Sequence, residues 1–258
     1  MQLDLTGKTA LVTGSGRGMG KATAKELADN GADVVVNDID EAVAEEAAAE
    51  IAELGADTVG LPADVSDEAA VEAMVETATE ELGQIDILVN NAGVGDAGPF
   101  LDEQYDDTFD LNLDVHLHGA LNCTRAVVDG MVEEGYGKIV NFTSIHTKNG
   151  VGMSPAYDVG KYSLLGLTKS LALELGREGV RVNAVAPGWA NTRMVEGFSD
   201  AVTEQILENN PLGRFAEPED VAQAVAFLSA PASDYVNGHE LRVDGGQVPI
   251  DSWRLDTR

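Results

Sequence analysis

Residues 9 to 20 read TALVTGSGRGMG, a short apolar run followed at once by a glycine-rich loop. The run predicts a buried β-strand, and the segment KATAKELADNG (21 to 31) that follows has the apolar spacing of a helix. Gly14, Gly18 and Gly20 allow a tight turn through which the backbone could approach a pyrophosphate, whose charge favours a helix N-terminus. Glycine clusters occur in many turns, but a position between a strand and a helix predicts a dinucleotide-binding loop.

The alternation of strand and helix continues along the chain. Nearly continuous apolar strands need cover on both faces, which predicts an α/β fold with a doubly wound parallel sheet of the Rossmann type and helices on both faces. Glycines at 31, 55 and 83 are placed to end helices. Without a linker or repeat, residues 1–258 are expected to form one NAD-binding domain. The expected strands are TALVT (9–13), DVVVN (33–37), TVGLPA (58–63), IDILVN (85–90), KIVNFT (138–143), VRVNAV (180–185) and HELRV (239–243).

The charge balance is strongly acidic. The 258 residues include 45 acidic and 16 basic side chains, with a formal net charge of −29. Such a charge disfavours nucleic acid and anionic membranes as partners. The acids are spread over helical segments such as 38–54 and 66–82, which favours a folded protein with an acidic shell, as in halophilic proteins whose charges are screened by molar salt. The alternative is an ordinary acidic protein.

Several classes of protein are disfavoured by composition. No signal peptide and no apolar run of spanning length is present, so a cytoplasmic protein is expected. The single cysteine, Cys123, excludes an intramolecular disulfide and is expected in the core. His118 and His239 have no partners at metal-ligand spacing, so we expect no metal.

The second expected strand leads to a carboxylate that bears on the cofactor. Asp38 lies 18 residues after Gly20, where it could accept hydrogen bonds from the ribose hydroxyls of NAD and would repel the extra phosphate of NADP. Arg17 could instead pair with that phosphate, but Asp38 favours NAD, with NADP less favoured. Asp64 could contact the adenine or cap a helix. The cofactor contacts expected from these segments are Gly14, Arg17, Gly18, Met19, Gly20, Asp38, Asp64, Val65, Asn91, Ala92 and Gly93.

The segment MSPAYDVGK (153–161) places Tyr157 and Lys161 one helical turn apart. That spacing alone is common. However, TGSGRGMG, NNAG, KIVNFTS, YDVGK and APGWANT (186–192), in this order and over nearly the whole chain, resemble the short-chain dehydrogenase/reductase family. The resemblance implies a secondary alcohol or ketone as the small-molecule substrate, with Tyr157 as the acid/base and Ser144, thirteen positions earlier, as the active-site serine. It also implies that Pro187, Gly188 and Thr192 hold the nicotinamide.

The chemistry requires such a group of residues. An alcohol gives up a hydride only as its hydroxyl proton leaves, and a phenol of ordinary pKa near 10 is a poor base. The charges of Lys161 and the nicotinamide are expected to favour the phenolate, while Ser144 donates to the substrate oxygen. The family also forms dimers or tetramers, and the apolar helix expected at 162–175 suits a homodimer or homotetramer interface.

One position departs from the family. In the register set by Gly119 and Ser144, the segment FDLNLDVHLHG (109–119) has His116 where the family has an asparagine, and Asn112 lies one helical turn too early. His116 could relay protons from Lys161, since imidazole both donates and accepts, or it could only hold the helix backbone. Both roles stay open.

The segments after Ser144 and Pro187 are expected to determine the substrate. His146 and Trp189 are the predicted substrate contacts, with Thr147, Lys148 and Asn149 nearby, which favours a polyol or sugar-like substrate. Resemblances of segment 211–228 and of VHLHG leave a 3-oxoacyl or 3-hydroxyacyl thioester as the alternative, although the acids in 127–135 disfavour an acidic acyl carrier protein. A non-catalytic dinucleotide-sensing protein is the alternative of another class.

Overall fold

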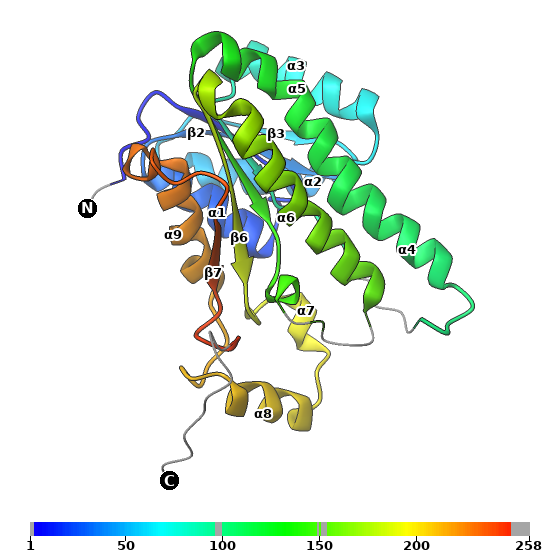
Figure 1. Cartoon of the computed structure of the whole chain (residues 1–258). Coiled ribbons are helices and arrows are strands. Elements are labelled where there is room, and N and C mark those ends of the chain that lie inside the picture. Colours follow the sequence, from blue (N-terminus) through cyan, green and yellow to red (C-terminus); the bar gives the residue numbers. More distant parts are fainter. Residues whose placement is uncertain (1–2, 96–99, 149, 151–153, 249–258) are drawn as a thin grey trace.

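The structure, a computed structural model, describes residues 3–95, 100–148, 150 and 154–248. Its strands form one parallel sheet with helices packed around it (Figure 1). The order of the strands is β3-β2-β1-β4-β5-β6-β7. This sheet confirms the predicted doubly wound fold, with strand bounds within about two residues of those expected. The strands are β1 Thr9–Val12, β2 Asp33–Asp38, β3 Thr58–Pro62, β4 Ile87–Asn90, β5 Gly137–Phe142, β6 Val180–Pro187 and β7 Glu240–Val243.

Helices cover both faces of the sheet. The strands are buried on both sides. Successive side chains point to opposite faces, so Ala10 and Val12 of β1 join one core cluster, and Leu11 joins the other. The first cluster is closed by α1, α2 and α9, and the second by α3, α5 and α6. The helices are α1 Gly18–Asp29, α2 Glu41–Ala52, α3 Glu68–Leu82, α4 Tyr105–Leu113, α5 Gly119–Glu134, α6 Pro155–Leu175, α7 Arg193–Glu196, α8 Asp200–Asn209 and α9 Pro218–Ser229.

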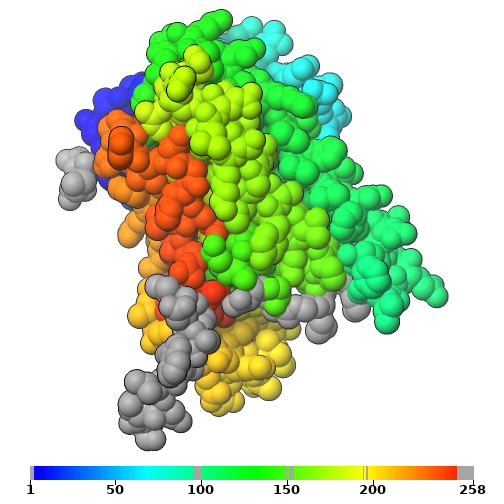
Figure 2. All heavy atoms as spheres, viewed as in Figure 1, coloured from blue at the N-terminus to red at the C-terminus, as the bar shows by residue number. Residues whose placement is uncertain are grey.

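The strand order reverses between β1 and β4, which lie side by side in parallel. From β1 the chain moves outward to β2 and β3, then crosses back to β4 and continues to β7 on the other side. Loops that leave the carboxyl ends of β1 and β4 therefore diverge, and the crevice between them is where such sheets bind ligands. α7 and α8 lie beyond this end of the sheet, at the bottom of Figure 1, and α8 projects there in the space-filling view (Figure 2).

Two helical features differ from the sequence expectation. α1 begins at Gly18, three residues before the expected segment at 21, so the last glycines of the loop form its first turn. Between α4 and α5 a π-helical turn, Asp114–His118, carries His116. Such a turn inserts one residue into a helix and has no distinct sequence pattern, so the spacing of apolar residues could not predict it. Within the described ranges, no helix is long and apolar enough to cross a membrane.

Candidate active site

The glycine loop after β1 lies against the segment after β4. Gly14 and Gly18 have φ angles of 60° and 53°, which L side chains rarely adopt. A Cβ at Gly14 would come within 2.8 Å of Ala92 Cα, and one at Gly20 would collide with Asn91 Nδ2. The first turn of α1 carries no acidic side chain, so its N–H groups and the helix dipole suit an anion. The loop therefore fits a dinucleotide pyrophosphate.

Asn91 and Asn37 support this loop from two sides. The Asn91 amide donates to the carbonyls of Thr13 and Gly14, both at 2.9 Å. The Asn37 Oδ1 accepts from Gly14 N–H at 3.3 Å, and its Nδ2 donates to Ala63 O at 3.2 Å. Sequence reasoning assigned Asn91 to the cofactor and missed Asn37. A polar residue at the end of a buried strand was the available signal for Asn37.

The Asp38 carboxylate ends β2 and faces the glycine loop. A Cβ at Gly16 would lie 2.6 Å from Asp38 Oδ2, so only a glycine lets the two segments come this close. Asp38 Oδ1 accepts from Asp40 N–H at 3.2 Å. Arg17 stands at the N-cap of α1 with its side chain exposed. Asp38 is thus held beside the loop, whereas Arg17 is directed to solvent.

Asp64 and Val65 follow β3. Asp64 Oδ1 accepts from Ser66 N–H and Oγ at 2.9 and 2.7 Å, while the α3 N-cap is Asp67, whose carboxylate accepts from the next turn. Asp64 is therefore not the helix cap. The Val65 side chain is buried in the core, and its carbonyl accepts from Asn122 Nδ2 at 3.0 Å. A cofactor could therefore contact Val65 through its backbone N–H, because the side chain and the carbonyl are already engaged.

The segment after β6 closes the crevice opposite the glycine loop. Pro187 ends β6, and Gly188 N–H donates to Val243 O at 2.9 Å. A Cβ at Gly188 would lie 2.9 Å from Asp244 Cα, so a larger residue would separate β6 from β7 here. Thr192 lies across from Gly18, since a Cβ there would be 3.8 Å from Thr192 Cγ2. The structure thus brings together both predicted halves of the cofactor site.

Ser144, Tyr157 and Lys161 meet at the carboxyl end of β5. Ser144 is the N-cap of the 3₁₀ turn Ile145–Thr147, and its Oγ accepts from His146 N–H at 3.2 Å. Tyr157 lies in the first turn of α6 and hydrogen-bonds the Ser144 side chain. One turn later, Lys161 Nζ donates to Phe142 O at 2.9 Å and lies 5.6 Å from the Tyr157 ring centroid.

Burial dominates the electrostatics of this group. It lowers the pKa of Lys161 to about 7, because the buried ammonium loses its hydration. Burial also raises the pKa of Tyr157, and the hydrogen bond with Ser144 opposes the shift. The nearby Asp158 carboxylate adds to the increase in the pKa of Tyr157. The expectation that Lys161 and the nicotinamide charge together favour the phenolate stays a prediction. A bound cofactor would add its own charge.

His116 is almost fully buried beside Tyr157. The two rings meet edge to face with centroids 5.4 Å apart. His116 Nε2 accepts from Val94 N–H at 3.2 Å, so the ring holds the segment after β4. Burial, followed by the Lys161 charge, lowers the pKa of His116 to about 2. Asn112, one turn earlier, donates to Thr108 O at 2.8 Å within α4.

His146 and Trp189 lie on the other side of Tyr157. The His146 ring meets Tyr157 edge to face at 5.1 Å and Trp189 at 6.3 Å, and Trp189 in turn contacts Phe198 at 5.2 Å. His146 Nδ1 lies 2.5 Å from Asp158 Oδ1. Sequence reasoning did not assign Asp158, although its position directly after Tyr157 was a usable signal. Asn149 lies outside the described residues.

Glu240 of β7 is a third residue, after Asn37 and Asp158, that the sequence did not reveal. Its buried carboxylate lies 2.8 and 2.7 Å from the hydroxyls of Thr143 and Thr147, which flank Ser144, and 3.5 Å from Lys148 Nζ. The contacts span more than 90 residues of sequence. No local pattern could therefore predict them.

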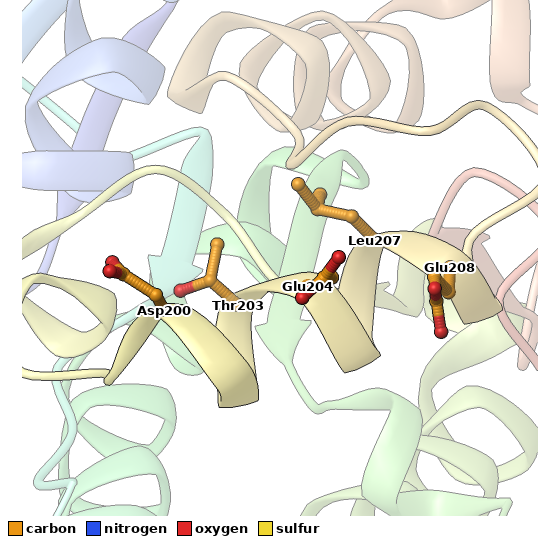
Figure 3. Close-up of a pocket in the computed structure, with 5 residues that line it drawn as sticks. All are labelled: Asp200, Thr203, Glu204, Leu207 and Glu208. Carbon is orange, nitrogen blue, oxygen red and sulfur yellow. The ribbon is translucent and has the colours of Figure 1, made fainter.

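Other parts of the described chain offer no competing chemistry. Nowhere in those residues is a group of three or more His, Cys, Asp or Glu placed to hold a metal ion. Cys123 is buried, as predicted, and burial raises the pKa of its thiol to about 12. A surface hollow of about 550 Å³ is lined by one face of α8 (Figure 3): Asp200, Thr203, Glu204, Leu207 and Glu208. The three carboxylates lie on one exposed helix, and none of the residues placed in the cofactor site lines this hollow.

A dinucleotide-binding sheet with a serine, a tyrosine and a lysine at its carboxyl edge defines an oxidoreductase of alcohols and ketones. The comparisons agree: residues 14–247 match the family described as enoyl-(acyl carrier protein) reductase. The chain belongs to the short-chain dehydrogenase/reductase family and is an enzyme that acts on CH–OH groups with a nicotinamide cofactor. This favours the enzyme over the non-catalytic sensing protein.

Three similar proteins illustrate the range of the family. The (2S)-((R)-hydroxy(phenyl)methyl)succinyl-CoA dehydrogenase subunit BbsD of Thauera aromatica is 40% identical, over 95% of this chain and 98% of the relative. A gluconate 5-dehydrogenase from Burkholderia cenocepacia, in complex with NADP and tartrate, has a TM-score of 0.91 at 34% identity, covering 95% and 97% of the two chains. A 7α-hydroxysteroid dehydrogenase complexed with NADH and 7-oxo glycochenodeoxycholic acid has a TM-score of 0.91 at 33% identity, covering 95% and 96%.

Proposed function

We propose that this enzyme transfers a hydride between NAD and a polar secondary alcohol or ketone, with Tyr157 as acid/base. The observation that carries the proposal is the meeting of Ser144, Tyr157 and Lys161 at the carboxyl edge of the sheet, beside the glycine loop. A cytoplasmic homodimer or homotetramer remains our expectation. Tyr162 and Leu173 of α6, 45% and 86% exposed, are apolar surface for such an interface.

The chain's residues divide the work between binding and proton transfer. The glycine loop would receive the pyrophosphate, and Pro187, Gly188 and Thr192 would hold the carboxamide end of the cofactor. Bound NAD supplies the hydride acceptor, or as NADH the donor. In oxidation, the Tyr157 phenolate takes the hydroxyl proton as the carbon loses its hydride, which leaves a ketone and a neutral phenol. Ser144 donates a hydrogen bond to the substrate oxygen.

Lys161 determines when Tyr157 can act as a base. Burial disfavours the Tyr157 phenolate and the Lys161 ammonium when each is considered alone. When both charges are present, the ammonium stabilises the phenolate, and their attraction offsets part of the desolvation cost of each. The same lysine would have hydrogen-bond donors left for a cofactor hydroxyl, since its Nζ has donor capacity beyond the bond to Phe142 O.

The choice of NAD rests on Asp38. Its carboxylate is fixed against Gly16 at the end of β2, where a 2′-phosphate would meet a negative charge at close range. The similar structures do not decide this point, because one contains NADP and another NADH. Arg17, exposed at the loop, is the residue that would favour NADP.

The proposed substrate is a polyol or sugar-like molecule. The paired His146 and Asp158 supply a polar group next to Tyr157, and Trp189 and Phe198 supply an apolar wall. When Nδ1 donates to Asp158, the neutral imidazole keeps Nε2 as an acceptor for a substrate hydroxyl. A 3-hydroxyacyl or 3-oxoacyl thioester is the second candidate, favoured by the 40% identity with the Thauera CoA-thioester dehydrogenase subunit.

The test is oxidation and reduction assays that follow NADH absorbance, with polyols and aldonates, 3-hydroxyacyl-CoA thioesters and hydroxysteroids, each with NAD and NADP. We expect higher kcat/KM with NAD and with polyols or aldonates. Tyr157→Phe should lower kcat at least about a hundredfold, while Tyr235→Phe, at a fully exposed tyrosine, should match the wild type. Activity that persists in Tyr157→Phe would contradict the mechanism.

Two further variants separate cofactor choice from substrate choice. Asp38→Ala should reduce the ratio of kcat/KM with NAD to kcat/KM with NADP. A wild type that prefers NADP tenfold would instead assign the cofactor choice to Arg17.

His146→Gln should raise KM for the polar substrate about tenfold without changing KM for NAD, as expected for one lost hydrogen bond. An unchanged substrate KM would remove His146 from the substrate site.

A further inference from the structure

The His116 ring fills a gap between two glycines on different elements. A Cβ at Gly93, after β4, would lie 2.9 Å from His116 Nε2, and a Cβ at Gly160, in α6, would lie 2.7 Å from Nδ1. Cβ atoms do not normally approach to such distances. The ring therefore fits only because the residue next to Nε2 and the residue next to Nδ1 are both glycines.

The ring also joins these two elements. His116 Nε2 accepts the Val94 N–H at 3.2 Å, and its face or edge meets Tyr157 with centroids 5.4 Å apart. Val94 follows the NNAG segment, in which Ala92 touches Gly14 of the glycine loop. A rigid contact thus runs from the acid/base tyrosine through His116 to the cofactor loop.

The protonation state follows from these contacts. Because Nε2 accepts a backbone N–H, the proton of neutral His116 is on Nδ1. Nδ1 has no hydrogen-bond partner among the described residues. Lys161 and Tyr157 of α6 face the ring, and Asp114 and His118 of its own π-helical turn are exposed. The positive charge of Lys161 opposes a second cation, so His116 stays neutral at working pH.

We propose that His116 is a positioning residue, a bracket that holds the Gly93–Val94 segment against Tyr157, and that Gly160 is the residue that admits its ring. The role differs from the proton relay that the sequence left open, because Nε2 is occupied by the Val94 N–H and Nδ1 has no hydrogen-bond partner among the described residues with which to exchange a proton. The π-helical turn at 114–118 fits this role, since an inserted residue turns one side chain inward.

The first test is a substitution cycle between His116 and Gly160. Gly160→Ala should lower Tm by about 3 °C or more, the shift that a cost near 1 kcal/mol produces in a chain of this size. Gly166→Ala is the matched control, because a Cβ there meets nothing within 4 Å in the same helix. Adding His116→Asn, whose side chain is smaller than imidazole, should restore most of the Tm lost in Gly160→Ala.

The second test separates a bracket from a relay. His116→Ala should raise the Kd for NADH about tenfold, measured by fluorescence, and leave the pH dependence of kcat unchanged, because the bracket acts on the cofactor loop. A relay would give the reverse: an unchanged Kd and an altered pH dependence of kcat. Cofactor binding and Tm do not depend on the proposed substrate or on turnover, so failure of the proposed function would leave them interpretable.

Three results would overturn the inference. These are a Gly160→Ala variant as stable as Gly166→Ala, a double variant no more stable than Gly160→Ala, and a His116→Ala variant with wild-type affinity for NADH. If Gly160→Ala does not fold, the double variant still decides, since its recovery of a folded protein is the expected result and its failure to fold contradicts it.

Discussion

Lys161 is a cation in a place that disfavours charge. Its side chain is buried, it donates to the Phe142 carbonyl, and burial lowers its pKa to about 7. The unfolded chain keeps an ordinary lysine near 10.4. Between these two values the unfolded state binds more protons than the folded state, so the free energy of unfolding rises with pH in this window. Below pH 7 the full cost of the buried charge is present.

A substitution isolates this effect in the cofactor-free protein. Relative to Lys161→Met, the wild type should gain about 2 kcal/mol of unfolding free energy between pH 6.5 and 9, because only the wild type loses a buried charge. Denaturant titrations at several pH values and one salt concentration measure the difference. Other titrating groups are common to both proteins and cancel. A difference that is flat across the window would contradict the lowered pKa.

The positions of Ser144, Tyr157 and Lys161 in the candidate site were predictable, because the family that the sequence resembles has a fixed spacing between these residues. Asp158 and Gly160, in the same helical turn, were not, because one acts through a contact with His146 and the other through the space it leaves for His116. Such roles depend on which residue of another element packs against the position, and a single sequence does not show these tertiary contacts.

At the scale of elements, β7 shapes the site although it carries no reacting group. Glu240 contacts Thr143 and Thr147 on either side of Ser144, so the last strand sets the conformation of the segment after β5. The strands themselves were predictable from buried apolar runs. Their cross-connections were not, because Glu240 reads as an ordinary polar residue at a strand edge.

Removing the Glu240 carboxylate tests this connection. Glu240→Leu should lower the free energy of unfolding by about 2 kcal/mol, as for lost hydrogen bonds to a charged group, and should lower kcat more than it raises KM for NAD. Denaturant unfolding and steady-state kinetics measure both. Lys148→Met, which removes only the 3.5 Å ion pair of a half-exposed lysine, is the control for stability and should change the free energy of unfolding little. An equal loss of stability in the two variants would contradict the role of the threonine contacts.

At the scale of the whole molecule, charge is the dominant feature. With 45 acids and 16 bases, most carboxylates have no cation to pair with. On α3, Glu72, Glu76 and Glu80 are exposed at intervals of four residues, so like charges are neighbours on one helix face. Repulsion of this kind opposes the compact state. Its range is about 10 Å at 0.1 M salt and about 3 Å at 1 M.

Tm should therefore rise steeply as KCl increases from 0.1 to 3 M, which calorimetry or fluorescence can follow. Molar salt acts on apolar burial as well as on charges, so the α3 carboxylates provide the decisive comparison. At 0.1 M KCl the triple variant Glu72→Gln, Glu76→Gln, Glu80→Gln should have a higher Tm than the wild type. Its free energy of unfolding should be higher by about 1 kcal/mol, because the repulsion between i,i+4 carboxylates and the long-range repulsion are relieved. At 3 M KCl the advantage should vanish, because screening has already removed what the substitutions remove. Sucrose, which favours compact states without screening charge, should raise both proteins equally and keep the gap open. A gap that persists at 3 M KCl, or a wild-type Tm that stays flat with salt, would show that the acidic shell is not adapted to salt.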